Sequence, residues 1–307
     1  MLPNIDWTKK ELLILAFDHR GTFLKNMFGV KEGGGTDEIK KTISDYKMII
    51  YEGFKLALQK GVPKEIAGIL VDEEYGSEVA LAAKREGITF AMPCEKSGQD
   101  EFDFEYGRDF AAHIEKFAPK FIKVLVRYNP EADAAANERQ AARLLELGRY
   151  LERTNQLFLF ELLVPSTPGQ LEKCRGDKKG YDLEMRPGLM VRAIQELQNA
   201  EVEPDVWKLE GLDRKGDYKA VCDTARSGGR TGVGCIVLGR GENEAKVREW
   251  LSVGANVDGV IGFAVGRTVF WEPLKQFKEN KLNRDQAIDQ ISKTYTSLCN
   301  LWIEARG

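Results

Sequence analysis

Eight short apolar segments recur along the whole chain, and stretches with helical spacing lie between them. Continuous apolar runs of this length are typical of strands that are buried on both faces. Strands that alternate with helices are expected to pair in parallel, because each crossover connection needs a helix or a long loop. The eight predicted strands are Leu12–Phe17, Ile66–Val71, Ile88–Met92, Phe121–Val126, Leu157–Val164, Val206–Glu210, Cys235–Leu238 and Gly259–Val265.

Amphipathic helices are predicted between and after these runs, because apolar residues recur there at intervals of three and four. Three helices have the clearest pattern: an early one, one in the middle of the chain and one that closes it. Their buried positions are Ile39, Ile43, Tyr46, Ile50, Phe54 and Leu58 in the first, Leu144, Leu147 and Leu151 in the second, and Ile288, Ile291, Tyr295, Leu298 and Trp302 in the last.

Eight strand–helix units predict a closed (β/α)8 barrel, since this is the usual architecture for that count. A doubly wound open sheet is the alternative, but it would need a nucleotide-binding loop. The chain has no P-loop and no G-x-G-x-x-G after the first strand. Its 307 residues contain no Pro- or Ser-rich linker and no change of composition midway. We therefore expect one α/β domain over residues 1–307.

Composition limits the partners of the chain. Apolar residues make up 43% and charged residues 30%, with a formal net charge of −3, so no basic surface for nucleic acid is expected. The longest apolar run, Leu12–Phe17, is too short for a membrane span or a signal peptide. These features predict a cytoplasmic protein that binds neither nucleic acid nor membranes. Barrels of this type commonly self-associate, so a homo-oligomer is a further expectation.

The sequence contains few residues of the kinds that metal sites and redox sites need. The only histidines are His19 and His113, too few for a zinc site built on several imidazoles. The five cysteines form no C-x-x-C pair and no even framework, which favours reduced structural thiols. We expect neither a metal nor an organic cofactor.

Charged side chains inside or at the end of apolar strands are the informative anomaly. Asp18 follows the first strand, Lys123 interrupts the fourth, Glu161 the fifth and Lys208 the sixth. Barrel strands alternate inward and outward residues, so an inward Lys208 also places Glu210 inside. A buried charge is costly unless it is paired. Two lysines and several carboxylates at one barrel mouth would satisfy one another.

This combination indicates Schiff-base chemistry. A lysine amine must be neutral to attack a ketone, and a second cation or an apolar surrounding favours the neutral form. Carboxylates would then move protons for dehydration of the carbinolamine and for carbon–carbon cleavage. The alternative interpretation is a set of internal salt bridges that only satisfy one another.

Two glycine–arginine turns follow the last two strands. They are Gly239-Arg240-Gly241 after the seventh strand and Gly266-Arg267 after the eighth. In many barrels these loops and a helix N-terminus bind phosphate. Glycine lets backbone N–H groups approach an anion closely, and arginine offers a bidentate fork. Ordinary tight turns with surface arginines are the alternative.

Other polar residues follow the first two strands. His19 and Arg20 come directly after Asp18, where His19 could act as a base or as a structural donor. The run Asp72-Glu73-Glu74 could hold a metal or cap a helix. Three long connections, Gly29–Asp37, Cys94–Tyr106 and Pro165–Leu183, would lie on the active-site face, either as substrate covers or as surface loops.

Four of these segments together resemble one enzyme family. They are FDHRG at residues 17–21, VDEEYG at 71–76, LGRG at 238–241 and GFAVGRT at 262–268. The chain resembles the bacterial 2-deoxy-5-keto-D-gluconate 6-phosphate aldolases over its whole length. This family is often found as the carboxyl half of a kinase–aldolase fusion in myo-inositol breakdown. In the placement of charges on its strands it is also similar to the class I tagatose 1,6-bisphosphate aldolases.

The resemblance implies cleavage of a six-carbon keto-sugar phosphate to dihydroxyacetone phosphate and an aldehyde, malonate semialdehyde in the inositol pathway. It implies that Lys208 forms the imine, Glu161 dehydrates the carbinolamine, Lys123 tunes the amine and Asp18 takes the hydroxyl proton. Arg267 and Arg240, with the glycines of their turns, would bind the phosphate, and His19 and Arg20 would help to bind substrate. The chain departs from the sugar-bisphosphate enzymes at Gly239-Arg240-Gly241, which replaces a serine–glycine turn. Arg240 could therefore bind phosphate or a substrate carboxylate.

The leading hypothesis is thus a metal-independent class I aldolase that acts on a small sugar phosphate. A related aldolase for another ketose phosphate, such as tagatose 1,6-bisphosphate or a sulfosugar phosphate, is one alternative. A metal-dependent lyase or isomerase that uses Asp72, Glu73 and Glu74 is another. The third is a non-catalytic regulator that binds sugar phosphates.

Overall fold

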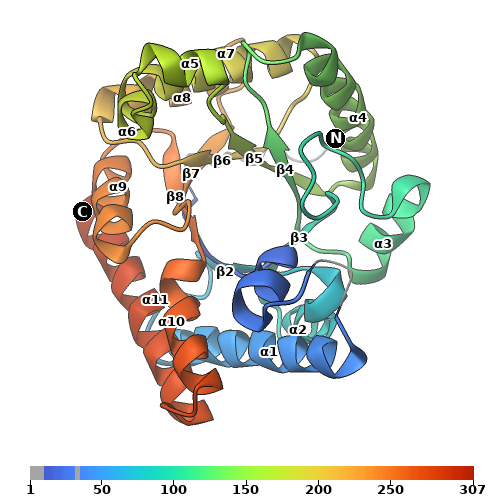
Figure 1. Cartoon of the computed structure of the whole chain (residues 1–307), viewed down its shortest axis with the longest axis vertical. Helices are drawn as coiled ribbons and strands as arrows, with labels where there is room; N and C mark the ends of the chain where they lie inside the picture. Colours follow the sequence, from blue (N-terminus) through green and yellow to red (C-terminus); the bar gives the residue numbers. More distant parts are fainter. Residues whose placement is uncertain (1–9, 32–34) are drawn as a thin grey trace.

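The computed structural model describes residues 10–31 and 35–307. Its strands form one closed barrel in sequential order, β1 to β8, and every pair of neighbouring strands is parallel. Helices surround the ring of strands on all sides (Figure 1). This confirms the predicted (β/α)8 barrel. Residues 32–34 of the Gly29–Asp37 connection lie outside the described residues.

The strands lie where the apolar runs predict them, within one residue at either end. Their bounds are β1 Leu12–Ala16, β2 Ala67–Leu70, β3 Thr89–Pro93, β4 Phe121–Arg127, β5 Leu157–Leu163, β6 Val206–Glu210, β7 Gly234–Leu238 and β8 Val260–Val265.

The helices predicted from periodicity correspond to α1, α4 and α11. Side-chain caps define where these helices begin, with Thr36, Asp133 and Asn283 accepting hydrogen bonds from their first turns. The principal helices are α1 Asp37–Gln59, α2 Glu73–Arg85, α3 Phe110–Phe117, α4 Ala134–Thr154, α7 Arg186–Asn199, α8 Lys215–Ala225, α9 Glu244–Ala255, α10 Arg267–Lys278 and α11 Arg284–Arg306. Short helical segments are η2 Phe23–Met27, η3 Gly107–Asp109, α5 Pro168–Lys173, α6 Lys178–Gly180 and η4 Tyr181–Met185.

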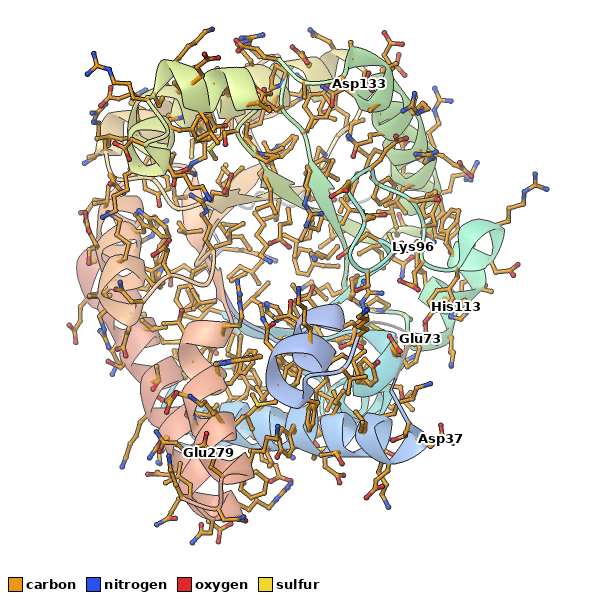
Figure 2. The ribbon with its side chains drawn as sticks, in the orientation of Figure 1. Asp37, Glu73, Lys96, His113, Asp133 and Glu279 are labelled. Carbon is orange, nitrogen blue, oxygen red and sulfur yellow. The ribbon has the colours of Figure 1, made fainter. Side chains whose placement is uncertain are left out.

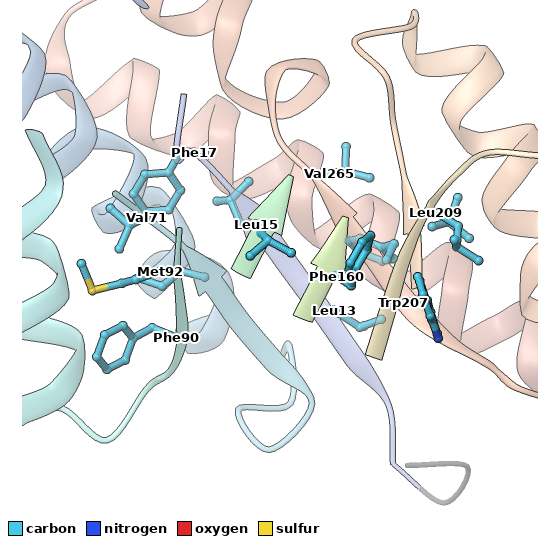
Figure 3. Close-up of a cluster of buried hydrophobic side chains, with 14 of the residues drawn as sticks. Leu13, Leu15, Phe17, Val71, Phe90, Met92, Phe160, Trp207, Leu209 and Val265 are labelled. Atoms are coloured by element: carbon cyan, nitrogen blue, oxygen red, sulfur yellow. The ribbon is translucent and has the colours of Figure 1, made fainter. Parts of the chain in front are cut away.

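Two apolar layers hold the barrel together. The outer layer fills the space between strands and helices, and Figure 3 shows part of it, including Phe160 and Trp207 on neighbouring strands. The inner layer fills the lower part of the barrel with residues from every strand, such as Ile14, Leu159 and Ile261. Because both faces of the strands are buried, the sequence shows continuous apolar runs rather than alternation.

The barrel interior becomes polar towards the carboxyl ends of the strands. On β4 the inward positions run from the apolar Phe121 through Lys123 to Arg127, and on β5 from Leu157 to Glu161. This end of a (β/α)8 barrel carries the active site in essentially all known enzymes of the fold. No helix in the described part of the chain has both the length and the apolarity needed to cross a membrane.

Barrel closure between β8 and β1 depends on a residue without a side chain. A Cβ atom at Gly262 would overlap the backbone of Leu12 on the neighbouring strand. We expect Gly262→Ala to lower the free energy of unfolding by at least about 1–3 kcal/mol, because backbone cannot yield as a side chain can. Urea denaturation measures this. Gly148→Ala in α4, where the new methyl meets nothing within 4 Å, should instead stabilise by about 0.5–1 kcal/mol. A neutral Gly262→Ala variant would contradict this account of closure.

Candidate active site

One ammonium group holds three carboxylates together at the barrel mouth. Lys123 Nζ lies 2.8 Å from Asp18 Oδ2, 2.6 Å from Glu95 Oε1 and 3.0 Å from Glu161 Oε2. All four side chains are buried. Lys123 donates hydrogen bonds to Asp18 and Glu95, and its contact with Glu161 is an ion pair.

Lys208 joins this cluster through Glu161. Its Nζ lies 2.8 Å from Glu161 Oε2, the same oxygen that Lys123 contacts. Glu161 and Lys208 are register partners on β5 and β6, so the pairing of the two strands sets this contact. The four charges predicted from the sequence, Asp18, Lys123, Glu161 and Lys208, therefore do converge on one site.

The cluster shifts the proton affinities of its members in opposite directions. Burial opposes ionisation of Asp18 and Glu161, but the charges of Lys123 and Lys208 outweigh it and hold the pKa of each carboxyl below its usual range. Burial likewise opposes the charge of Lys123, yet Asp18, Glu161 and Glu95 raise its pKa well above the ordinary value. For Glu95, burial prevails over Lys123 and Arg20 and raises the pKa. Glu95 is thus the carboxyl of the cluster that binds a proton most readily.

A second buried lysine fixes the turn that carries Asp18. Lys47 on α1 is fully buried and donates to the backbone oxygens of Phe17 (2.9 Å) and His19 (3.2 Å), on either side of Asp18. It also pairs with Asp72, whose other oxygen caps the start of α2 at Tyr75 N (2.9 Å). Asp72 is therefore a structural residue that ties α2 to the turn after β1.

His19 lies where two cavities meet. Burial, together with the charges of Arg267 and Lys208, outweighs the opposing effect of Asp18 and lowers the pKa of His19 to about 4. The imidazole is therefore neutral at pH 7. Its Nδ1 is buried and has no hydrogen-bond partner among the described residues.

The two cavities form two lobes on either side of Lys208 and Glu161. The first lobe, about 450 Å³, extends towards the loops after β1 and β3, and the second, about 390 Å³, towards the loops after β7 and β8. Both share His19, Glu161 and Lys208. A ligand that reaches Lys208 can therefore extend in two directions.

The second lobe contains the glycine–arginine turns. Gly239, Gly241, Gly266 and Arg267 line it, and Arg267 begins α10, whose N-terminus favours anions. Gly241 has φ +79°, and the Arg267 guanidinium occupies the space that a Cβ would take. Arg267 donates to the Arg240 carbonyl (3.1 Å) and forms no ion pair with a carboxylate of the described residues. Its charge is available to a ligand.

Arg240 and Arg20 are engaged with protein groups. Arg240 also lines the second lobe, but its Nη1 lies 2.7 Å from Asp182 and its Nε 2.9 Å from Glu210. Arg20 pairs with Glu105 (2.6 Å) and donates to the Glu95 carbonyl (2.7 Å). Both guanidiniums thus have carboxylate partners, which a ligand would have to share or displace.

The acidic run after β2 does not come together as a metal site. Asp72 is held by Lys47, while Glu73 binds His113 (2.7 Å) and Lys116 (3.0 Å) at the periphery of the barrel (Figure 2). Across residues 10–31 and 35–307, no group of three or more His, Cys, Asp or Glu side chains is placed to hold a metal ion.

Sequence reasoning missed Glu95 and Arg127, which both line the first lobe. Arg127 is the next inward position after the predicted fourth strand, and Glu95 is the second inward position after the predicted third strand, beyond Pro93. Counting by two from Ala91 inside the barrel reaches Glu95, and counting from Lys123 reaches Arg127. The signal was therefore present in the alternation of the strands. Lys47 gave no such signal, since its burial depends on the contact between α1 and β1.

The fold and the site define a (β/α)8 barrel with a buried lysine–carboxylate cluster towards the carboxyl ends of its strands. Residues 4–306 match the family described as "Uncharacterized protein conserved in bacteria (DUF2090)", and the chain belongs to this family. It is also similar to the tagatose 1,6-diphosphate aldolases of Listeria monocytogenes and Listeria innocua, with 27% identity over 218 residues. That alignment covers 68% of this chain and 58% of the length of those relatives.

Solved structures agree on the fold. The fructose-bisphosphate aldolase of Plasmodium falciparum superposes with a TM-score of 0.66 at 15% identity, covering 97% of this chain and 92% of that one. Cgl0159 of Corynebacterium glutamicum superposes with a TM-score of 0.60 at 14% identity, covering 96% and 92% of the two chains.

Removal of the central ammonium should make stability depend on pH in the opposite sense to the wild type. In Lys123→Met, three carboxyls face one another without their common cation, so their folded pKa values rise above the unfolded ones. We expect a loss of about 3–5 kcal/mol at pH 7.5. A smaller loss is expected at pH 5, where the carboxyls take up protons in the folded state. Urea denaturation at both pH values measures this, with the exposed Lys84→Met in α2 as control. An equal loss at both pH values would contradict the proposed coupling.

Proposed function

We propose that this protein is a class I aldolase that cleaves a keto-sugar phosphate through an imine on Lys208. The observation that carries the proposal is the placement of Lys208 in the middle of β6, where it is buried beside Glu161 and Lys123 and lines two cavity lobes. Similarity to the tagatose 1,6-diphosphate aldolases supports the same reaction class.

In the proposed mechanism the neutral amine of Lys208 attacks the ketone carbon of the substrate. Glu161, 2.8 Å from Lys208 Nζ, gives a proton to the carbinolamine hydroxyl, which leaves as water and produces an iminium ion. Asp18 takes the proton of the hydroxyl two carbons away, the carbon–carbon bond breaks, and its electron pair forms an enamine. Protonation of the enamine and hydrolysis of the imine release dihydroxyacetone phosphate and restore Lys208.

The two lobes suggest a substrate that is anionic at both ends. Arg267 offers a charge in the second lobe. Lys25 and Lys96 line the first lobe and Arg127 lines both, and none of the three pairs with a carboxylate of the described chain. Lys96 lies on the loop after β3 (Figure 2). A phosphate at one end and a carboxylate or second phosphate at the other would suit these charges.

The substrate that we propose is 2-deoxy-5-keto-D-gluconate 6-phosphate, with malonate semialdehyde as the second product. This keto-sugar acid has a phosphate and a carboxylate at its ends, and the motifs at residues 17–21 and 262–268 favour it. Tagatose 1,6-bisphosphate also fits two anion sites and agrees with the similar Listeria enzymes. A kinetic comparison of kcat/KM for the two compounds, with a sulfosugar phosphate as a third, distinguishes them.

The imine is testable by trapping. Incubation with dihydroxyacetone phosphate and borohydride, in buffer that contains a chelator, should reduce an adduct onto one lysine, and peptide mass mapping should place it at Lys208. Lys208→Met should abolish both the adduct and turnover, because Lys208 is the amine that contacts Glu161 where the two lobes meet. Exposed Lys84→Met in α2 serves as the matched control. An adduct on another lysine would refute the assignment of Lys208, and the absence of any adduct would refute the aldolase proposal.

The phosphate site in the second lobe rests on Arg267. We expect Arg267→Met to raise KM for the phosphorylated substrate on the order of 10–100-fold, because a hydrogen bond between charged groups contributes about 1.5–3 kcal/mol. Stability should change little, since Arg267 has no carboxylate partner in the described residues. Steady-state kinetics measures KM, with the exposed Arg108→Met as control. An unchanged KM would show that phosphate binds elsewhere.

A further inference from the structure

Glu95 is the carboxyl of the buried cluster to which the proposed mechanism gives no role. Its Oε1 lies 2.6 Å from Lys123 Nζ. Its Oε2 is shut off from solvent and has no hydrogen-bond partner among the described residues. A buried carboxylate oxygen without a donor is costly. A proton on this carboxyl relieves the charge.

Glu95 is also the end of a continuous series of ion-pair contacts that starts at Lys208. Lys208 Nζ is 2.8 Å from Glu161 Oε2, Glu161 Oε2 is 3.0 Å from Lys123 Nζ, and Lys123 Nζ is 2.6 Å from Glu95 Oε1. Each nitrogen–oxygen distance lies within the range of about 2.6–3.2 Å over which acid–base groups exchange protons. This series of contacts connects the amine of Lys208, which is proposed to form the imine, to a carboxyl that does not touch it.

We propose that Glu95 stores the proton that Lys208 must release before it attacks a ketone, and that Glu161 and Lys123 conduct this proton. The inference rests on the proposed function of Lys208. Lys208 gives a proton to Glu161, Lys123 gives one to Glu95, and Glu161 passes its proton to Lys123 after the amino group rotates about its Cε–Nζ bond. Lys208 ends as a neutral amine and Glu95 as a carboxylic acid, while Glu161 and Lys123 regain their starting states.

The transfer reduces the number of charges buried in the cluster. Asp18, Glu95 and Glu161 with the two lysines carry a net charge of −1 before the transfer. Two charges disappear together when Glu95 takes the proton of Lys208, so the net charge stays at −1. Transfer to Glu161 alone would place the proton on a carboxyl that still faces the ammonium group of Lys123, the largest of the charges that hold its pKa low. Glu95 is the better store because burial raises its pKa.

The stored proton has a use later in the reaction. When the carbinolamine hydroxyl leaves as water, it needs a proton, and Glu161 is the group in contact with the Lys208 nitrogen. The same transfers in reverse order return the proton from Glu95 through Lys123 to Glu161. No proton has to enter the buried cluster from solvent between release by the amine and departure of water.

The substitution Glu95→Gln tests whether Glu95 stores the proton, because glutamine keeps the shape of the side chain and an acceptor for Lys123 but cannot take up a proton. The rate of imine formation with dihydroxyacetone phosphate is measured by cyanoborohydride trapping of the Lys208 peptide between pH 6 and 9. At pH 7 we expect a decrease on the order of 100-fold, the usual size of an acid–base contribution. The rate should recover as the pH rises, because hydroxide then removes the proton. The other charged or titratable groups that act on Glu95, and whose titration also enters this pH profile, are Lys123, Arg20, Asp18 and the Cys94 thiol.

Further variants separate proton storage from packing. Glu95→Asp keeps an acid and should retain a faster rate than Glu95→Asn, which has the same length and no proton affinity; this pair serves if Glu95→Gln does not fold. Asp205, on the loop before β6, is another carboxyl whose pKa is raised by burial, and it lies outside the lysine–carboxylate cluster. Asp205→Asn should therefore leave the rate of imine formation unchanged. The proposal that Glu95 stores the proton would be refuted by a wild-type rate and pH profile in Glu95→Gln, or by equal rates for the aspartate and asparagine variants. Absence of an adduct in the wild type would overturn the aldolase proposal itself.

Discussion

The ion cluster around Lys123 is the interaction on which the upper half of the barrel depends. Through one ammonium group it joins β4 and β5 to the segments that follow β1 and β3, and it connects β6 through Glu161 and Lys208. Below it the barrel is filled by an apolar layer that needs no partners. Above it two cavity lobes open towards the loops. The cluster is thus the boundary between a packed interior and a site that can hold a ligand.

Much of this arrangement could be read from the sequence because two simple periodicities govern it. Strand boundaries followed from the apolar runs, and the inward direction of Lys123, Glu161 and Lys208 followed from their positions within those runs. Glu95 was missed because the apolar run before it ends at Met92, while the inward alternation continues through the loop residue that follows β3. Alternation in a barrel strand therefore extends further than hydrophobicity does.

The partners of the arginines could not be derived in this way. Arg240 and Arg267 follow neighbouring strands in similar glycine turns, yet Arg240 binds Asp182 and Glu210 whereas Arg267 has no carboxylate partner in the described residues. Asp182 comes from the long connection after β5, whose path depends on the short helices α6 and η4. Burial of Lys47 similarly depends on how α1 packs against β1. Contacts between distant segments of this kind leave no local pattern.

The free energy lost on burying the charged cluster helps to decide whether the cluster is structural or functional. Five ionisable groups buried together lose hydration that their mutual attraction only partly restores, and apolar residues of the same volume would hold a barrel at least as well. The alternative of purely structural salt bridges explains why each charge has a partner, but it leaves Glu95 Oε2 without one. It also leaves unexplained why the charges border both cavity lobes instead of the closed end. A site that must release and recover a proton beside a lysine accounts for both features, because such a site needs an acceptor that is not already saturated.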